Sequence, residues 1–267
     1  MSNPLRRLLG RARSGARPAQ PATPLTQAQL DRQRRRGMNL TELAVEFGTD
    51  KAGDGENDHH YTQHYERHLE HLRGETFTLL EIGIGGYKHA KKGGESLRMW
   101  KWFFPKAQIV GLDLQDKSWV EAGRIKVYQG SQDDEAVLRQ IVDEQGPIKV
   151  VIDDGSHQPV HIRETFRILF PLIEANGVYC IEDTQTSYWP EFGGQEDRQA
   201  PGTTMALVKD LIDGLNYMEF LDDGYEPTYS DLNITGISCY HNLVVIQKGD
   251  NREGSNKRMV LKERYQS

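Results

Sequence analysis

Short apolar runs alternate with amphipathic segments along residues 38–250, and this alternation most limits what the chain can fold into. The run at residues 148–152 is almost entirely apolar, as expected of a parallel strand buried on both faces. We predict an α/β fold with a doubly wound, Rossmann-like, seven-stranded sheet and an open site at the carboxyl ends of its strands. Strands are expected at residues 76–84, 108–114, 124–129, 148–152, 177–181, 230–240 and 242–247, the last two as an antiparallel pair. Helices are expected at residues 40–47, 61–72, 94–104, 133–144, 160–172 and 203–217.

Charge and composition together divide the chain into three parts. Residues 1–37 hold nine arginines and one acid, a net +8, so the rest of the chain carries −14 of the total of −6. We expect an Arg/Pro-rich, disordered leader over residues 1–37, one α/β domain over residues 38–250, and a polar tail over residues 251–267. The acidic body argues against nucleic acid as the partner, because phosphate binding requires an excess of Lys and Arg on the binding face.

Cysteine content and hydropathy limit the compartment. Cys180 and Cys239 are too few for a disulfide framework or a four-cysteine zinc site. No apolar run is long enough for a transmembrane helix, and no signal peptide is evident. We therefore expect a cytoplasmic protein without integral membrane association.

A glycine turn follows the first expected strand. Residues 81–86 read Glu-Ile-Gly-Ile-Gly-Gly, so Gly83 and Gly85 stand where the apolar run ends. Glycine lets a backbone approach a ligand without a clash at Cβ. The second strand ends at Asp113, whose carboxylate can accept hydrogen bonds from a ribose diol. Together these features predict a cofactor that contains adenosine.

The spacing of the glycines separates two kinds of cofactor. A dinucleotide fingerprint requires a third glycine where Lys88 stands, and an acid about 20 residues further on. Here a Lys/Gly-rich insertion at residues 87–93 places Asp113 further along the chain than that spacing allows. The observed form suits S-adenosylmethionine, which has no pyrophosphate to place on a helix N-terminus. Ser131 and Gln132 follow the third strand, where they can offer acceptors to adenine or serve as a helix cap.

Acidic residues follow two further strands. Asp154 comes just after the strand at residues 148–152, and Glu182 and Asp183 follow the next strand. Adjacent parallel strands lie about 4.8 Å apart, so these carboxylates are expected to meet. They would repel one another unless a cation lay between them, and oxygen ligands favour Mg²⁺. The alternative is that the acids only cap a helix and form a turn.

His157 stands three residues after Asp154. An imidazole exchanges protons near neutral pH, which suits a general base at the mouth of a site. His161 follows one helical turn later and is expected to support His157. We therefore take His157 and Asp154 as the catalytic candidates.

These motifs resemble the metal-dependent sugar O-methyltransferases, and the resemblance covers roughly residues 40–248. The matching stretches are residues 49–51, 59–62, 81–86, 94–100, 152–157, 182–183, 187–190 and 241–244. It implies a class I methyltransferase fold, S-adenosylmethionine as cofactor, Mg²⁺ on Asp154, Glu182 and Asp183, and His157 as base. The candidates for cofactor binding are Glu81, Gly83, Gly85, Ser96, Asp113, Ser131, Gln132, Asp154 and Tyr61.

The resemblance also implies a saccharide or glycoside acceptor, in an antibiotic or a bacterial polysaccharide such as a methylmannose chain, and a homo-oligomer. Aromatic side chains are candidates for the walls of the acceptor pocket: Tyr61, Tyr65, Tyr188, Trp189 and Phe192. Three alternatives stay open: an NAD(P)-dependent dehydrogenase, a metal-dependent hydrolase, and a non-catalytic binding protein of the same fold.

Overall fold

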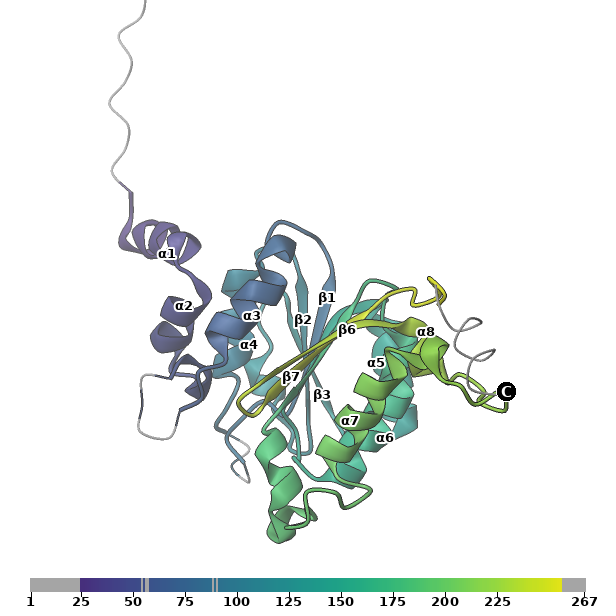
Figure 1. The fold of residues 1–267 in the computed structure, drawn as a ribbon. Coiled ribbons are helices and arrows are strands. Elements are labelled where there is room, and N and C mark those ends of the chain that lie inside the picture. Colours follow the sequence, from purple (N-terminus) through teal and green to yellow (C-terminus); the bar gives the residue numbers. More distant parts are fainter. Residues whose placement is uncertain (1–24, 54, 56–57, 88, 90, 256–267) are drawn as a thin grey trace, which may run out of the picture.

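Seven strands form one mixed sheet in the order β3-β2-β1-β4-β5-β7-β6 (Figure 1). The computed structural model describes residues 25–53, 55, 58–87, 89 and 91–255. β1 to β5 run parallel, and β7 is antiparallel to both β5 and β6. The predicted doubly wound sheet with an antiparallel C-terminal pair is confirmed. The strands are β1 Thr78–Ile82, β2 Gln108–Asp113, β3 Ile125–Gln129, β4 Ile148–Asp153, β5 Val178–Glu182, β6 Ile234–Tyr240 and β7 Leu243–Lys248.

Helices cover both faces of the sheet. On one face, Leu43, Tyr65 and Trp100 pack in a single apolar core with the sheet, and on the other face Leu138 and Val208 pack in a second core. Both cores follow from helices with one apolar side placed against buried strands. The first face is covered by α2 Leu40–Phe47, α3 Thr62–Leu69 and α4 Glu95–Phe103, and the second by α5 Glu135–Gln145, α6 Pro159–Leu172 and α7 Thr204–Gly214.

β4 lies between β1 and β5 and is buried along its whole length. The register pairs Asp153 with Ile82 of β1 and with Ile181 of β5. The three strands therefore end at the same level, and the residues that follow them gather at one edge of the sheet. This edge carries the candidate site.

The segment at residues 27–37 differs from the prediction. Composition predicted disorder, but α1 spans Gln27–Gly37. Thr26 and Gln29 form a capping box at its start, and two of its arginines pair with Glu46 of α2. These local contacts stabilise a helix that charge composition alone does not favour. Residues 1–24 and 256–267 lie outside the described residues.

A smaller difference occurs before β6. The expected strand at residues 230–240 begins only at Ile234, because α8 spans Tyr229–Asn233. Thr228 and Asp231 form a capping box that starts this helical turn.

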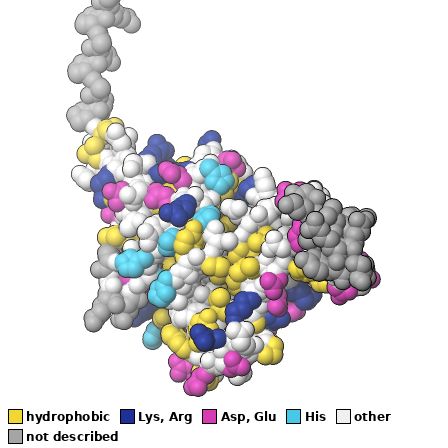
Figure 2. Space-filling model, viewed as in Figure 1, with side chains coloured by type: hydrophobic (Ala, Val, Ile, Leu, Met, Phe, Trp, Pro, Cys, Tyr) yellow, Lys and Arg dark blue, Asp and Glu magenta, His cyan; other side chains and the backbone are white. Residues whose placement is uncertain are grey.

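Within the described part of the chain, no helix is both long and apolar enough to cross a bilayer. In the view of Figure 1, apolar side chains gather over the middle of the visible surface and charged side chains surround them (Figure 2).

Candidate active site

The glycine turn after β1 is shaped by its contact with the end of β4. A Cβ on Gly83 would lie 2.1 Å from the carbonyl oxygen of Asp154, and the φ of Gly83 is +77°. Gly85 also has a positive φ, of +74°. Only glycine combines this backbone conformation with so close an approach. The turn therefore brings the main chain of β1 directly beside the acidic end of β4.

Asp113, at the end of β2, is held in a fixed orientation. Its Oδ1 accepts a hydrogen bond from the backbone N–H of Gln115 at 2.8 Å, and its Oδ2 accepts one from Ile84 at 3.3 Å. Nζ of Lys117 lies 3.0 Å from the same Oδ2 and also donates to the carbonyl of Gly85. Because the Lys117 side chain is fully buried, it joins the glycine turn to the carboxylate expected to hold a ribose.

The loop after β3 contributes differently from what the sequence suggested. Oε1 of Gln132 accepts a hydrogen bond from the backbone N–H of Ser156 at 2.7 Å, and its Nε2 donates to Oδ1 of Asp153 at 3.0 Å. Oγ of Ser131 donates to Asp133. The amide of Gln132 thus fixes the loop after β4 from inside the protein.

Two adjoining cavities, each of about 350 Å³, follow the strand ends. Both are lined by Gly83, Tyr87, Asp113 and Gly155, so they form one continuous site. The first also contains Ser131 and Gln132, and the second also contains Gly85, Ser96, Asp154, His157 and Asp183. A larger cavity of about 870 Å³ lies between α6, α7 and α8 and includes none of the predicted site residues.

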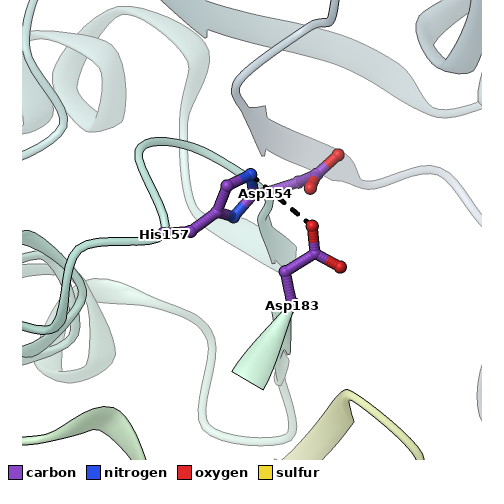
Figure 3. Close-up of side chains that lie close together, drawn as sticks. All are labelled: Asp154, His157 and Asp183. Atoms are coloured by element: carbon purple, nitrogen blue, oxygen red, sulfur yellow. Dashed lines mark ion pairs between the residues drawn. The ribbon is translucent and has the colours of Figure 1, made fainter. Parts of the chain in front are cut away.

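Asp154, His157 and Asp183 converge at the ends of β4 and β5 (Figure 3). Nε2 of His157 lies 3.6 Å from Oδ2 of Asp183. Both residues have a positive φ, +56° for His157 and +53° for Asp183, which is uncommon outside glycine and costs about 1–3 kcal/mol each. Such strain persists where the surroundings enforce it, and it is concentrated at functional sites.

The same three side chains suit a divalent cation. Each offers one ligand atom, and these atoms all lie within 4.8 Å of one another. Nδ1 of His157 is buried without a hydrogen-bond partner among the described residues. Carboxylate oxygens are the ligands that Mg²⁺ prefers. Asp154 and Asp183 therefore fit the cation that the sequence implied, whereas Glu182, the third predicted ligand, is not among the three side chains that converge here.

Glu182 lies deeper than the sequence prediction placed it. Its side chain is only 2% exposed, and its Oε1 accepts a hydrogen bond from the hydroxyl of Tyr65 at 2.5 Å. Its Oε2 lies 2.7 Å from Nζ of Lys51, which also lies 2.6 Å from Oδ2 of Asp154 and 3.7 Å from Oε1 of Glu81. The ammonium of Lys51 thus occupies the space among three of the acids expected at the site.

Burial and charge set the protonation of this cluster. Burial raises the pKa of Glu182 well above its usual value, and repulsion from Asp154 adds to the rise. Burial would lower the pKa of Lys51, but Asp154, Glu182 and Glu81 outweigh it and hold that pKa well above its usual value. Burial would also raise the pKa of Asp183, but His157 and the Tyr61 hydroxyl keep it below its usual value. Lys51 is therefore charged, and Asp183 is ionised at neutral pH.

Two aromatic residues expected at the acceptor pocket are instead buried supports. The hydroxyl of Tyr61 donates to Oδ1 of Asp183 at 2.7 Å, and its ring is 2% exposed. Tyr65 is fully buried beneath Glu182. Neither side chain lines either of the two cavities, so the structure does not place these two tyrosines as walls of a pocket there. Tyr188 and Trp189 are partly exposed, at 39% and 44%.

The other predicted residues take supporting positions. Glu81 is fully buried, and its Oε2 accepts a hydrogen bond from Oγ of Ser96 at 2.8 Å. The sequence reasoning assigned no role to Lys51 or Lys117. The signal for Lys51 was its place in a stretch, residues 49–51, that resembles known enzymes, and the signal for Lys117 was its spacing of four residues from Asp113.

The fold is that of the class I methyltransferases. A MycE methyltransferase from the mycinamycin biosynthetic pathway, solved with Mg and SAH, matches 81% of this chain with a TM-score of 0.78 and 47% identity, over 56% of its own length. A second structure of MycE, in complex with Mg, SAH and mycinamycin VI, has the same TM-score at 44% identity and covers 86% of this chain and 60% of its own.

Relatives of known activity are similar over the same region, although no family model matches the chain. The chain is 47% identical over 221 residues to mycinamicin VI 2''-O-methyltransferase of Micromonospora griseorubida, which covers 82% of this chain and 55% of the relative. It is 46% identical to demethylmacrocin O-methyltransferase of Streptomyces fradiae, over 81% of this chain and 54% of the relative. The chain spans about half the length of these relatives. The resemblance to sugar O-methyltransferases is thereby confirmed.

Proposed function

We propose that this chain transfers a methyl group from S-adenosylmethionine to a sugar hydroxyl with the help of Mg²⁺. The observation that carries the proposal is the meeting of Asp154, His157 and Asp183 beside the cavity that holds the glycine turn and Asp113. Methyl transfer from S-adenosylmethionine to a metal-bound hydroxyl uses both the acid-lined cation site and the adenosine-binding turn, which share one continuous cavity.

The cofactor would lie across the two adjoining cavities. Asp113 is positioned by Lys117 and Ile84 to accept the ribose hydroxyls. Gly83 and Gly85 both line the second cavity, and a Cβ on Gly85 would meet no atom of another residue closer than 3.7 Å, so the cofactor can pass close to the main chain there. This path leads from the loop after β3 to the acids at the end of β4.

We propose Asp154, Glu182 and Asp183 as the residues that hold Mg²⁺. Asp154 and Asp183 face the cavity, and the carboxylate of Glu182 keeps lone pairs beyond those used by Lys51 and Tyr65. A bound divalent cation supplies Lewis acidity, which lowers the pKa of a hydroxyl that it polarises. Lys51 balances part of the negative charge, so the cluster does not depend on the cation for its folding.

His157 is the proposed general base. Nε2 of His157 lies near Asp183, whose ionised carboxylate would stabilise the imidazolium formed when Nε2 takes a proton. The hydroxyl of Thr186 donates to the backbone carbonyl of His157 at 2.8 Å and fixes the loop that carries it. The ring can therefore accept the acceptor hydroxyl's proton while the methyl group moves to the oxygen.

The acceptor is proposed to be a saccharide or glycoside. A further relative, 38% identical, is an L-olivosyl-oleandolide 3-O-methyltransferase, whose name specifies a glycoside. Tyr188 and Trp189 also leave aromatic surface exposed just after β5. We further expect a homo-oligomer. The low cysteine content supports a reducing, cytoplasmic location.

Titration calorimetry tests the proposal at the level of binding. We expect SAH to bind with and without Mg²⁺, and NAD not to bind. Asp113→Asn should weaken SAH binding, whereas Asp143→Asn, which changes an exposed acid outside both cavities, should leave it unchanged. Tight binding of NAD without binding of SAH would favour a dehydrogenase and overturn the proposal.

A further inference from the structure

A second charged cavity lies at the opposite end of the sheet from the candidate active site. It has a volume of about 360 Å³ and is lined by Arg32, Arg36, Arg73, Lys101, Trp102 and Arg124, together with a proline and a glycine. Arg73 precedes β1, Lys101 lies near the end of α4 before β2, and Arg124 precedes β3. These positions mark the amino ends of the strands. We call this the basic cavity.

The basic cavity contains five cationic residues and no acidic one among its described lining. Elsewhere on α1 the arginines do find acids, because Arg34 and Arg35 both pair with Glu46. Arg32 and Arg36 stand four residues apart and therefore share one side of the helix. Neither of their side chains has a hydrogen bond or an ion pair to another described residue, so both are free to bind a ligand.

The other three cations are held in place by backbone carbonyls. Arg124 donates to the carbonyls of Phe104 and Lys101, at 3.0 and 2.6 Å. Lys101 donates to the carbonyl of Ala122 at 2.7 Å. Neutral carbonyls fix these groups but leave their positive charges uncompensated, so the charges add to the field in the cavity.

Arg73 also connects the cavity to α1. Its Nη2 donates to the carbonyls of Met38, at 2.6 Å, and Arg36, at 3.2 Å. Its guanidinium lies 4.9 Å from the ring centroid of Phe103. The carboxyl end of α1 is therefore held beside the cavity, and Arg36 of its last turn lines the same space.

Burial lowers the pKa of Arg124, and it lowers that of Lys101 with a further contribution from the neighbouring Arg124. The shift of Arg124 reflects burial alone, and that of Lys101 also reflects the like charge of Arg124 nearby. An anion bound among them would relieve that repulsion.

We propose that the basic cavity binds a multiply charged, phosphate-bearing anion. Guanidinium groups offer the planar pairs of donors that match phosphate oxygens, and four of the five cations are arginines. The size of the cavity suits a phosphate or diphosphate group rather than a folded partner. The site also assigns a role to Arg32 and Arg36, which the proposed methyl transfer does not explain.

The test is calorimetric titration of the full chain with inorganic diphosphate at low ionic strength. We expect saturable binding that NaCl at matched ionic strength does not reproduce. Arg32→Gln/Arg36→Gln should weaken it at least about tenfold, since each lost charge-assisted hydrogen bond is worth about that factor. The control, Arg34→Gln/Arg139→Gln, removes the same charge from residues that pair with Glu46 and Glu135 and should bind diphosphate within about twofold of the native chain.

Two further arms identify the source of the anion. Vesicles of phosphatidylglycerol, compared with phosphatidylcholine, test a lipid headgroup, and a single-stranded RNA tests a polymer. Absence of saturable diphosphate binding, or equal loss in both double variants, would overturn the proposal. So would binding to vesicles or RNA in a chain that does not bind free diphosphate. SAH binding is expected to be equal in all these variants, which separates this test from that of the active site.

Discussion

Nζ of Lys51 lies 2.7 Å from Oε2 of Glu182, and both side chains are withdrawn from solvent. The same ammonium reaches Asp154 and approaches Glu81, so one lysine balances three carboxylates drawn from β1, β4 and β5. Without it, the ends of these strands would bring buried negative charges together. Lys51 thus allows an acidic site to form before any cation binds.

Replacement of Lys51 by Met should destabilise the fold strongly. Removal of one partner from a buried ion pair leaves an uncompensated charge and costs about 3–5 kcal/mol in the free energy of unfolding. Chemical denaturation without Mg²⁺ measures this loss. We expect added Mg²⁺ to stabilise Lys51→Met more than the native chain, because the cation can replace part of the missing charge. A loss below about 1 kcal/mol would mean that Lys51 is not the counter-charge.

Tyr65→Phe tests the hydrogen bond to Oε1 of Glu182, the carboxylate oxygen that Lys51 does not contact. The variant removes the hydroxyl that donates to Oε1 of Glu182 and leaves a buried carboxylate oxygen without its partner. The expected cost is about 1–3 kcal/mol in the free energy of unfolding. Tyr188→Phe is the matched control, since that tyrosine is partly exposed, and it should change stability by less than about 0.5 kcal/mol.

Lys117 is expected to position Asp113 for ribose recognition. Lys117→Met should reduce the affinity for SAH about tenfold or more, because Asp113 loses a buried charged partner. The decisive comparison uses an SAH analogue that lacks one ribose hydroxyl. The native chain should bind this analogue much more weakly than SAH, and Lys117→Met should discriminate less between the two. Unchanged discrimination would show that Lys117 only stabilises the fold.

Glu81 should make stability depend on pH. Burial raises its pKa from 4.5 to about 7, so the folded chain retains a proton that the unfolded chain has already lost between these values. The stabilising contribution is therefore complete below pH 4.5 and is lost as pH rises through 7, by about 3 kcal/mol in total. Glu81→Gln should flatten this slope in denaturation at a series of pH values. Glu70→Gln, at an exposed position, should retain it.

The sequence predicted the sheet and the acidic edge because both follow from local patterns. Apolar runs of strand length end in Gly83, Asp113, Asp154 and Asp183, and parallel strands end at a common edge. The meeting of Asp154, His157 and Asp183 therefore required only the order of the strands. The disorder predicted for residues 27–37 was wrong, since the capping box at Thr26 outweighed a composition rich in arginine.

Burial of polar side chains was the part that the sequence could not predict. Lys51 lies in a short 3-10 helix, η1 Asp50–Ala52, 103 positions before Asp154, and no periodicity shows that its side chain extends into the interior. Tyr61 and Tyr65 have the aromatic character of pocket walls, yet their hydroxyls turn inward to Asp183 and Glu182. Such roles depend on long-range packing, which local sequence does not encode.

Product analysis by mass spectrometry tests the central claim most directly. The chain is incubated with Mg²⁺, methyl-labelled S-adenosylmethionine and a pool of glycosides. We predict one labelled methyl group on a sugar oxygen, no product in the presence of EDTA, and recovery when Mg²⁺ is restored. His157→Ala should slow the reaction at least about 10²-fold while SAH still binds. Full activity in chelator, or in His157→Ala, would contradict the account.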